Sequence, residues 1–306
     1  MSQPGRPMST RSEGPGPGED PGASLETGPV RTFLADPLPA GVSRALIEQV
    51  ERAGLRASQP PEQLELDGWL LRRLPGKAKR ARCVNALAEG ERSLDEKLAT
   101  CARLYREAGL PLYVRVTPFS EPSGLDAALH ARGWRLHDPT RVLVHPALAQ
   151  LPHIDAPADV VEQAADASTY AAAVGALRGS SPGEMAAHAL RLRASPAPYT
   201  GWIWHEATAV PTAAPGPALA CAQVARDGAL AGLYDVFTAA PARGRGLATA
   251  LCASVLRRAH AAGAGVGYLQ VDAGNAAALK VYERLGFVDV YGYHYRLAPE
   301  DEARAY

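Results

Sequence analysis

Residues 235–249 read DVFTAAPARGRGLAT, and this stretch decides the fold class. The apolar run before it predicts a strand and the run after it predicts a helix, so that a glycine-rich turn lies between them. The first N–H groups of a helix have no intrahelical partners, and together with the helix dipole they favour an anion. Gly244 and Gly246 allow the backbone to approach a phosphate closely, and Arg243 and Arg245 add positive charge. The stretch therefore predicts a pyrophosphate site at the start of a helix.

Composition places the chain among soluble globular proteins. It has 306 residues, of which 47% are hydrophobic and 21% are charged, with 32 basic and 32 acidic side chains. Zero net charge argues against nucleic acid as a partner, since phosphate contacts need a basic surface. No apolar run approaches the roughly 20 residues that a membrane span needs.

The cysteines and histidines predict neither a disulfide framework nor a metal site. Four cysteines lie far apart without a CxxC pair, and no His, Asp and Glu cluster has metal-ligand spacing. Scattered thiols of this kind are typical of reduced cysteines in the cytoplasm.

The chain divides into three segments. Residues 1–36 form a Gly/Pro-rich stretch that predicts a disordered tail, because it has no apolar period. Residues 37–150 and 157–298 each alternate predicted strands and helices, which favours two α/β units with mixed sheets.

The two α/β segments resemble each other. The first ends with PLYVRVTP, a helix and HARGWRLHDPTRVLV, and the second with GYLQVDA, a helix and ERLGFVDVYGYHYRL. Gly133-Trp134 and Gly286-Phe287 fall at matching places, each a helix-ending glycine followed by an aromatic residue. This order predicts two tandem copies of one unit.

A dinucleotide is one possible ligand for the glycine turn. Gly244-x-Gly246 opens a helix, and Asp272 ends the next predicted strand, where a ribose partner could lie. However, Thr249 stands where the third glycine of that fingerprint is expected, and the loop before the glycines is longer than a tight dinucleotide turn.

The turn resembles the acyl-CoA loop of the GNAT superfamily of N-acetyltransferases, whose pattern is Gln/Arg-x-x-Gly-x-Gly/Ala. Arg243, Gly246 and Ala248 match it completely. In that family the loop amides hold the CoA pyrophosphate, and the preceding strand splays and binds the pantetheine arm. The resemblance implies these cofactor-binding residues: Val236, Phe237, Thr238, Arg243, Gly244, Arg245, Gly246, Leu247, Ala248, Thr249 and Asn275.

A second motif of the same family follows. Its pattern, Asn-x-x-Ala-x-x-x-Tyr-x-x-x-Gly-Phe, is matched by Asn275, Ala278, Tyr282, Gly286 and Phe287. The resemblance implies that Asn275 contacts the cofactor and that Tyr282 protonates the leaving CoA thiolate. Each has a structural alternative: Asn275 is a good helix N-cap, and Tyr282 shares a helix face with apolar neighbours.

The general base is expected on a strand beside the cofactor. Asp235 is the best-placed carboxylate, and Glu206 and His205 are weaker choices.

The first unit lacks the glycine turn, which predicts a degenerate, non-acetylating copy. We expect its basic turn, residues 77–82, to shape or cover the acceptor site, or simply to be solvated. Trp69, Arg72 and Asn85 are candidates to touch the acceptor.

These features predict a tandem GNAT-like protein that transfers an acetyl group from acetyl-CoA directly to an amine, without a metal or a covalent enzyme intermediate. A small-molecule acceptor is expected, with no nucleic acid or membrane partner, in a cytoplasmic monomer or homodimer. The alternative is a non-catalytic acyl-CoA-binding sensor or scaffold.

Overall fold

The computed structural model describes residues 32–207 and 216–304. Most of the segment expected to be a tail, residues 1–31, therefore lies outside the described residues.

The first half of the chain forms a small α/β unit with a long final strand. Its elements are β1 (Phe33–Leu34), α1 (Arg44–Ala57), β2 (Gln63–Leu66), β3 (Trp69–Arg72), η1 (Lys79–Ala81), β4 (Val84–Ala86), α2 (Leu94–Glu107), β5 (Tyr113–Val116), α3 (Leu125–Ala131), β6 (Arg135–His145) and η2 (Leu148–Gln150).

The second half has longer strands and two additional helices. Its elements are β7 (Val160–Ala165), α4 (Ala167–Arg178), α5 (Pro182–Ala194), β8 (Tyr199–Glu206), β9 (Ala218–Asp227), β10 (Leu230–Thr238), η3 (Ala240–Ala242), α6 (Leu247–Ala261), β11 (Val266–Asp272), α7 (Ala276–Arg284), β12 (Val288–Leu297) and η4 (Pro299–Arg304).

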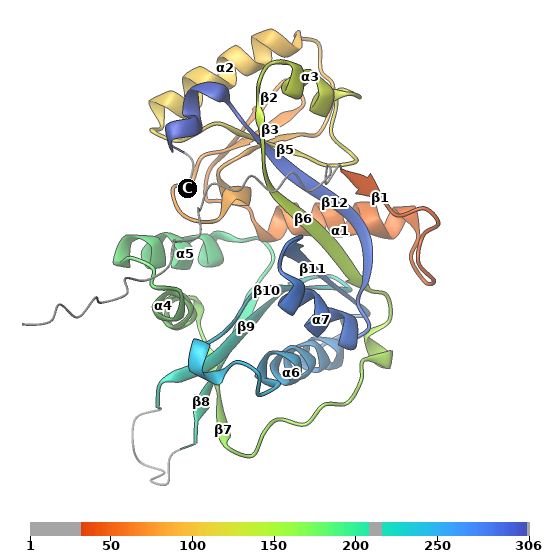
Figure 1. Cartoon of the computed structure of the whole chain (residues 1–306), viewed down its shortest axis with the longest axis vertical. Coiled ribbons are helices and arrows are strands. Elements are labelled where there is room, and N and C mark those ends of the chain that lie inside the picture. Colours follow the sequence, from red (N-terminus) through yellow and green to blue (C-terminus); the bar gives the residue numbers. More distant parts are fainter. Residues whose placement is uncertain (1–31, 208–215, 305–306) are drawn as a thin grey trace, which may run out of the picture. The chain divides into compact units, whose positions relative to one another are not determined.

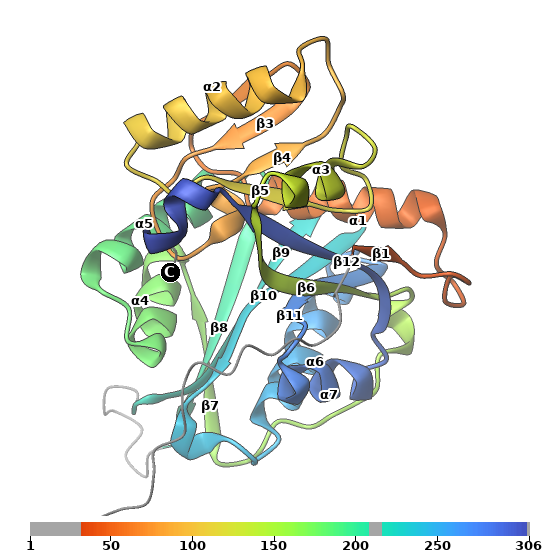
Figure 2. The same ribbon diagram turned by 45° about the horizontal axis from the view of Figure 1, so that its top comes forward.

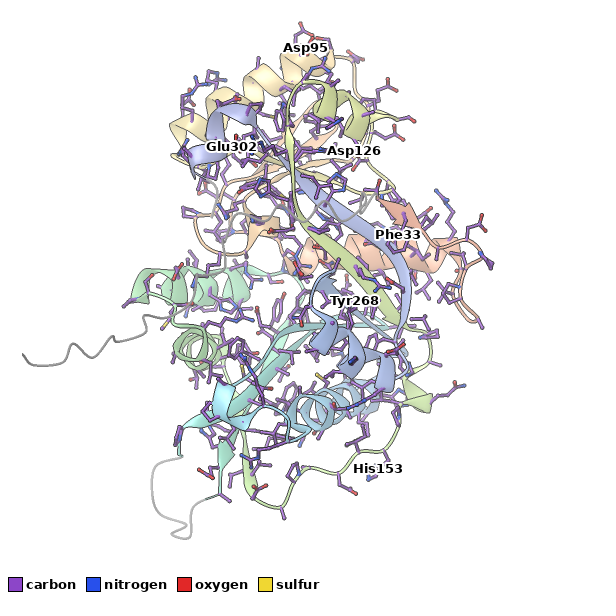
Figure 3. The ribbon with its side chains drawn as sticks, in the orientation of Figure 1. Phe33, Asp95, Asp126, His153, Tyr268 and Glu302 are labelled. Atoms are coloured by element: carbon purple, nitrogen blue, oxygen red, sulfur yellow. The ribbon has the colours of Figure 1, made fainter. Side chains whose placement is uncertain are left out.

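Strand β1 lies within the last residues of the segment predicted to be a tail. It carries Phe33, labelled in Figure 3, and pairs with β12. A Cβ on Gly292 would come within 2.6 Å of the Phe33 ring, so the glycine makes room for this side chain. The end of the tail, expected at residue 36, is therefore corrected to a position before Phe33, because the Phe33 ring packs against Gly292 of β12.

All the strands of the described residues belong to one twelve-stranded sheet. Its order is β2-β3-β4-β5-β12-β6-β11-β10-β9-β8-β7, with β1 attached to β12. The mixed α/β architecture predicted from the sequence is confirmed, since β4 pairs with β5 and β10 pairs with β11 in parallel and the other pairs are antiparallel.

The two halves exchange their final strands. β6 ends the first half but pairs with β11 of the second, with Tyr268 opposite Val144. β12 ends the second half but pairs with β5 of the first, with Tyr295 opposite Arg115. The two exchanged strands also pair with each other in the middle of the sheet (Figure 1). The segments 37–150 and 157–298 are therefore joined through each other's last strands.

The internal repeat is visible in the connections. β5–α3–β6 and β11–α7–β12 have the same order, and each helix ends at a glycine with a left-handed backbone, Gly133 at φ 79° and Gly286 at φ 86°. In both copies the next residue is aromatic, and its backbone N–H donates to a carbonyl of the helix, from Trp134 to Leu129 and from Phe287 to Tyr282.

Helices cover both faces of the second-half strands (Figure 2). Ala220 and Ala222 of β9 pack in the core beneath α6, whereas Cys221 between them packs with Tyr170 and Val174 of α4. This alternation is the two-residue period of a strand that is buried on both faces. Among the described helices, none combines the length and apolarity that crossing a bilayer requires.

Candidate active site

The site begins where β10 leaves its parallel neighbour. β10 pairs with β11 only over residues 230–233, and its register with β9 shifts between Tyr234 and Phe237. Asp235 within this bulge has φ 49°, an unusual backbone for a non-glycine residue. The last part of β10 therefore diverges from β11 and opens a gap between the two strands.

The glycine turn leaves the start of α6 uncovered. Gly244 and Gly246 have φ of 78° and 77°, and Gly246 is the N-cap residue, which offers no capping side chain. The first N–H groups of α6 therefore keep the donors that a phosphate requires.

The corresponding helix of the first half is closed by its own side chains. At the start of α2, the Ser93 hydroxyl accepts from the Glu96 N–H, and the Glu96 carboxylate accepts from the Ser93 N–H at 2.9 Å. This capping box occupies the donors that α6 leaves open. That the first half is a non-acetylating copy stays a prediction, and this difference between α2 and α6 is in keeping with it.

A cavity of about 540 Å³ lies over the glycine turn and the diverging end of β10. The predicted cofactor residues that line it are Val236, Phe237, Thr238, Arg243, Gly244, Gly246, Leu247, Ala248, Thr249 and Asn275. Residues from α7, including Ala278 and Tyr282, form the opposite wall. One continuous space therefore joins the two sequence motifs.

Arg245 is the predicted cofactor residue that does not line this cavity. Its Nη2 lies 2.5 Å from a carboxylate oxygen of Asp159, and so the side chain has a surface partner of its own. Arg243 remains on the cavity wall, with its guanidinium 5.9 Å from the centre of the Phe237 ring.

A second cavity, of about 460 Å³, adjoins the first. The two share Val236, Asn275, Ala278 and Tyr282, and we call the second one the cleft. Asn275 also caps α7: its Oδ1 accepts from the Ala278 N–H at 3.1 Å, which is the helix N-cap role expected as the alternative to cofactor binding. The gap beside the end of β10 thus connects the cavity over the glycine turn with the cleft, which is the more polar of the two.

Tyr282 stands at the junction of the cavities with little exposure to solvent. Its side chain is 8% exposed, and its ring packs edge to face against Phe287 at 6.0 Å. Burial raises the pKa of its phenol well above the usual value, so the hydroxyl keeps its proton near neutral pH.

Asp235 lies on the wall of the cleft among cationic groups. Its Oδ1 is 3.0 Å from Arg178, and its Oδ2 is 3.1 Å from His188 Nε2, 3.6 Å from Arg191 and 2.6 Å from the Gln223 amide nitrogen. Burial alone would raise the pKa of Asp235, but these partners outweigh it and hold the pKa well below its usual range. Such a carboxylate is a poor general base, so this geometry disfavours the base role expected for Asp235.

The weaker base candidates lie away from the cleft lining. His205 is buried and contacts Gln163 Oε1 at 2.9 Å, and neither His205 nor Glu206 lines the cleft. His188 of α5 was missed in the sequence, because it has no local motif and reaches the site only when α5 packs against β10.

The first half contributes η1 to the cleft. Residues 77–81 of the basic turn line it, together with Asp138 and Thr140 of β6. Trp69, Arg72 and Asn85 do not line it: each is at most 3% exposed within β3 and β4, where it supports the sheet. The basic turn therefore lines the cleft and these three strand residues do not, since alternation in the sequence does not show which face of β3 meets the cleft.

The comparisons with known proteins agree with this geometry. A family model described as "Probable histone acetyltransferase Rv0428c C-terminal" matches residues 44–296. The chain belongs to this family. The match spans both halves, as the exchanged strands require. A search of curated protein sequences found no match.

Solved structures of GNAT proteins share the fold. A GCN5-related N-acetyltransferase from Kribbella flavida superposes with a TM-score of 0.59 at 16% identity, covering 85% of this chain and 97% of that one. Another from Sphaerobacter thermophilus gives 0.51 at 17% identity, covering 82% and 85%. A tandem GNAT protein of the clavulanic acid pathway gives 0.52 at 16% identity, covering 67% and 69%.

The chain is therefore a GNAT-superfamily protein with an acetyltransferase fold, and the resemblance seen in its two motifs is confirmed. Among the described residues, no group of three or more His, Cys, Asp and Glu side chains is arranged to hold a metal ion.

Proposed function

We propose that the protein transfers an acetyl group from acetyl-CoA directly to a primary amine of a small molecule. The observation that carries this proposal is the junction of the two cavities at Val236, Asn275, Ala278 and Tyr282. A thioester placed at this junction would face donor-binding residues on one side and an acceptor chamber on the other.

The donor side suits the pyrophosphate and pantetheine of CoA. The open N–H groups at the start of α6 and the guanidinium of Arg243 supply donors and charge for the pyrophosphate. The diverging strand at residues 236–238 leaves backbone groups for the amide-rich arm.

Direct transfer is favoured because the described chain offers no activated thiol. All four cysteines are buried; burial raises the pKa of Cys83 and Cys221 to about 11 and that of Cys101 and Cys252 to about 12. Thiolate, the nucleophilic form, is therefore scarce at neutral pH. In the proposed step the amine attacks the thioester carbonyl, the C–S bond breaks, and the amine loses one proton.

Tyr282 is the proposed acid. Its neutral phenol lies where the sulfur would leave, and it would give the departing thiolate a proton.

His188 is the proposed base, with Asp235 as its positioning residue. Asp235 contacts Nε2, which leaves Nδ1 of the imidazole to accept the proton of the amine. A base held by a carboxylate is a recurring arrangement in proton transfer.

A protein lysine is the second candidate acceptor, because the description of the matching family names a histone acetyltransferase. A non-catalytic acyl-CoA sensor is the third reading. It would keep the donor cavity but would have no use for the junction with the cleft.

A panel of amines, supplied with acetyl-CoA and followed by release of free thiol, tests these readings. The panel contains small amines and a lysine-bearing histone-tail peptide, and His188→Gln is assayed beside the parent. Transfer to small amines that His188→Gln slows at saturating acetyl-CoA is expected. Transfer to the peptide alone would favour the protein acceptor, and tight acetyl-CoA binding without any transfer would favour the sensor.

A further inference from the structure

The cleft contains more positive than negative charge near one end. Lys77 and Glu184 pair at 3.4 Å, and Lys79 and Asp138 pair at 2.5 Å, so these four side chains balance one another. Asp235 is one negative charge shared by two arginines, Arg178 and Arg191. Arg80 adds a further guanidinium with no salt bridge to any described residue.

The backbone of Arg80 is held in place, while one nitrogen of its side chain has no hydrogen-bond partner among the described residues. The Arg72 guanidinium donates to the Arg80 carbonyl at 3.5 Å, and Leu74 N–H donates to the Ala81 carbonyl at 3.0 Å, which fixes η1. The Arg80 guanidinium lies 5.4 Å from the centre of the Tyr234 ring, and its buried Nη1 has no hydrogen-bond partner in the described chain.

A buried polar atom without a hydrogen-bond partner is unfavourable, so Nη1 of Arg80 has a donor to offer to a ligand. The buried carboxylate of Glu51 is already occupied: it receives two hydrogen bonds from Arg115, one of them at 2.9 Å, and another from Tyr291. The planar fork of arginine fits a carboxylate in a bidentate manner.

The opposite charge lies near the junction of the cavities. Asp272 ends β11 and lines the cleft beside Asn275, with Oδ1 accepting from the Gly274 N–H. The cleft therefore has a cationic end at Arg80 and a carboxylate at the donor side.

We propose that the acceptor is a small amine that carries a carboxylate, with the carboxylate bound by Arg80 and the ammonium group drawn toward Asp272. This inference rests on the proposed function. Tyr234, over which Arg80 lies, precedes the junction residue Val236 by two positions on β10. Because Arg80, Asp272 and the junction residues line one cleft, the carboxylate and the amine would belong to one small molecule, such as an amino acid.

Matched acceptors test the charge requirement. Each amino acid is compared with its decarboxylated amine and its carboxamide at saturating acetyl-CoA. The carboxylate form is expected to have a kcat/KM about 10- to 100-fold higher, the usual effect of a charge-assisted hydrogen bond. Arg80→Gln should abolish this preference, Arg80→Lys should keep part of it, and both should bind acetyl-CoA as the parent does.

The matched control is Arg103→Gln on the exposed face of α2, where Arg103 pairs with Glu107 and lies outside both cavities. It should retain the preference. Because Arg80 has no ion pair to lose, Arg80→Gln should keep or raise the Tm, which a structural arginine would not do.

A binding measurement separates this inference from the proposed function. N-acetylated amino acids, which resemble the product, are titrated by calorimetry into the full chain saturated with CoA. Absence of transfer to any amine would overturn the proposed function, yet binding that Arg80→Gln removes would still support the carboxylate site. Equal kcat/KM for amino acids and their decarboxylated amines, a preference that survives Arg80→Gln, or no binding of the N-acetylated compounds would each overturn the inference.

Discussion

Gly246 shows how one residue makes an anion site at the start of a helix. It takes a left-handed backbone, φ 77°, and caps α6 without a side chain, so the phosphate donors remain open. No described atom lies within 4 Å of a Cβ placed on it, so no other part of the described chain packs against this face of the turn.

Gly246→Val should therefore abolish CoA binding while the protein stays folded. The left-handed backbone costs a branched residue about 1–2 kcal/mol, and the side chain would enter the phosphate space. Gly179→Val is the matched control, because Gly179 also has a left-handed backbone, φ 65°, and open surroundings but ends α4 outside both cavities. Calorimetry and a melting curve measure both variants; a CoA affinity within a factor of two of the parent would show that the cradle is misplaced.

Tyr282→Phe should slow turnover more than it weakens acetyl-CoA binding. The phenol keeps its proton because it is buried, and loss of a general acid costs roughly 10²–10⁴-fold in rate. Tyr105→Phe is the comparison: its hydroxyl donates to the Arg72 carbonyl at 2.7 Å, far from the cavities, and should affect stability but not kcat. An unchanged kcat in Tyr282→Phe would leave Tyr282 as a packing residue.

The two sequence motifs could be found because they are local. Each places its glycines, asparagine and tyrosine within a short stretch, and the structure joins both stretches at one cavity. Arg80 and His188 could not be singled out in the same way. Arg80 is one of several cations in the 77–82 turn, and His188 is one polar residue on a helix; only tertiary packing brings both to the cleft.

At the scale of elements, Asp235 connects two helices to the bulged strand. Arg178 of α4 and His188 and Arg191 of α5 meet its carboxylate, and the Tyr170 hydroxyl of α4 donates to its carbonyl at 2.9 Å. The bulge that opens the donor cavity and the helices that wall the cleft are therefore held by the same residue.

Asp235→Asn should lower stability at neutral pH, and the deficit should shrink in acid. The pKa of Asp235 is depressed in the folded chain, so its contribution is full above the unfolded value of about 3.9 and is lost as the pH falls through the lower folded value. Because the side chain is 20% exposed, a loss of about 1–3 kcal/mol at pH 7 is expected.

Urea unfolding of both proteins between pH 7 and pH 3 measures this effect. An Asn variant that is as stable as the parent at pH 7, or a deficit that grows as the pH falls, would show that the ion cluster does not hold the helices.

Helix starts were the elements most accessible to sequence reasoning. Ser93 with Glu96 and Ser181 with Glu184 both form capping boxes, and a serine three residues before a glutamate is a local signal of a helix start. Strand neighbours were not accessible. The sequences of β6 and β12 suit several positions in a sheet and do not say which half each strand will join.

For the whole molecule, the exchange of β6 and β12 makes each half depend on the other. Residues 150–306 alone would leave β11 without β6 and β12 without both of its neighbours. Unpaired central strands are aggregation surfaces, so this fragment should be poorly soluble.

Co-expression of residues 32–149 with residues 150–306 should restore a soluble complex that binds CoA, because it supplies both exchanged strands. Gel filtration of the fragment and of the co-expressed pair measures this. A soluble, fully active C-terminal fragment would contradict the dependence that the sheet order implies.

The central claim is that the turn at residues 243–249 binds the pyrophosphate of CoA rather than that of a dinucleotide. Calorimetric titration of the full chain with acetyl-CoA and, separately, with NADH tests it most directly. The open α6 terminus, the cavity shared by both motifs and the missing third glycine predict micromolar or tighter binding of acetyl-CoA and no binding of NADH. Binding of NADH without acetyl-CoA, or of neither, would contradict the account.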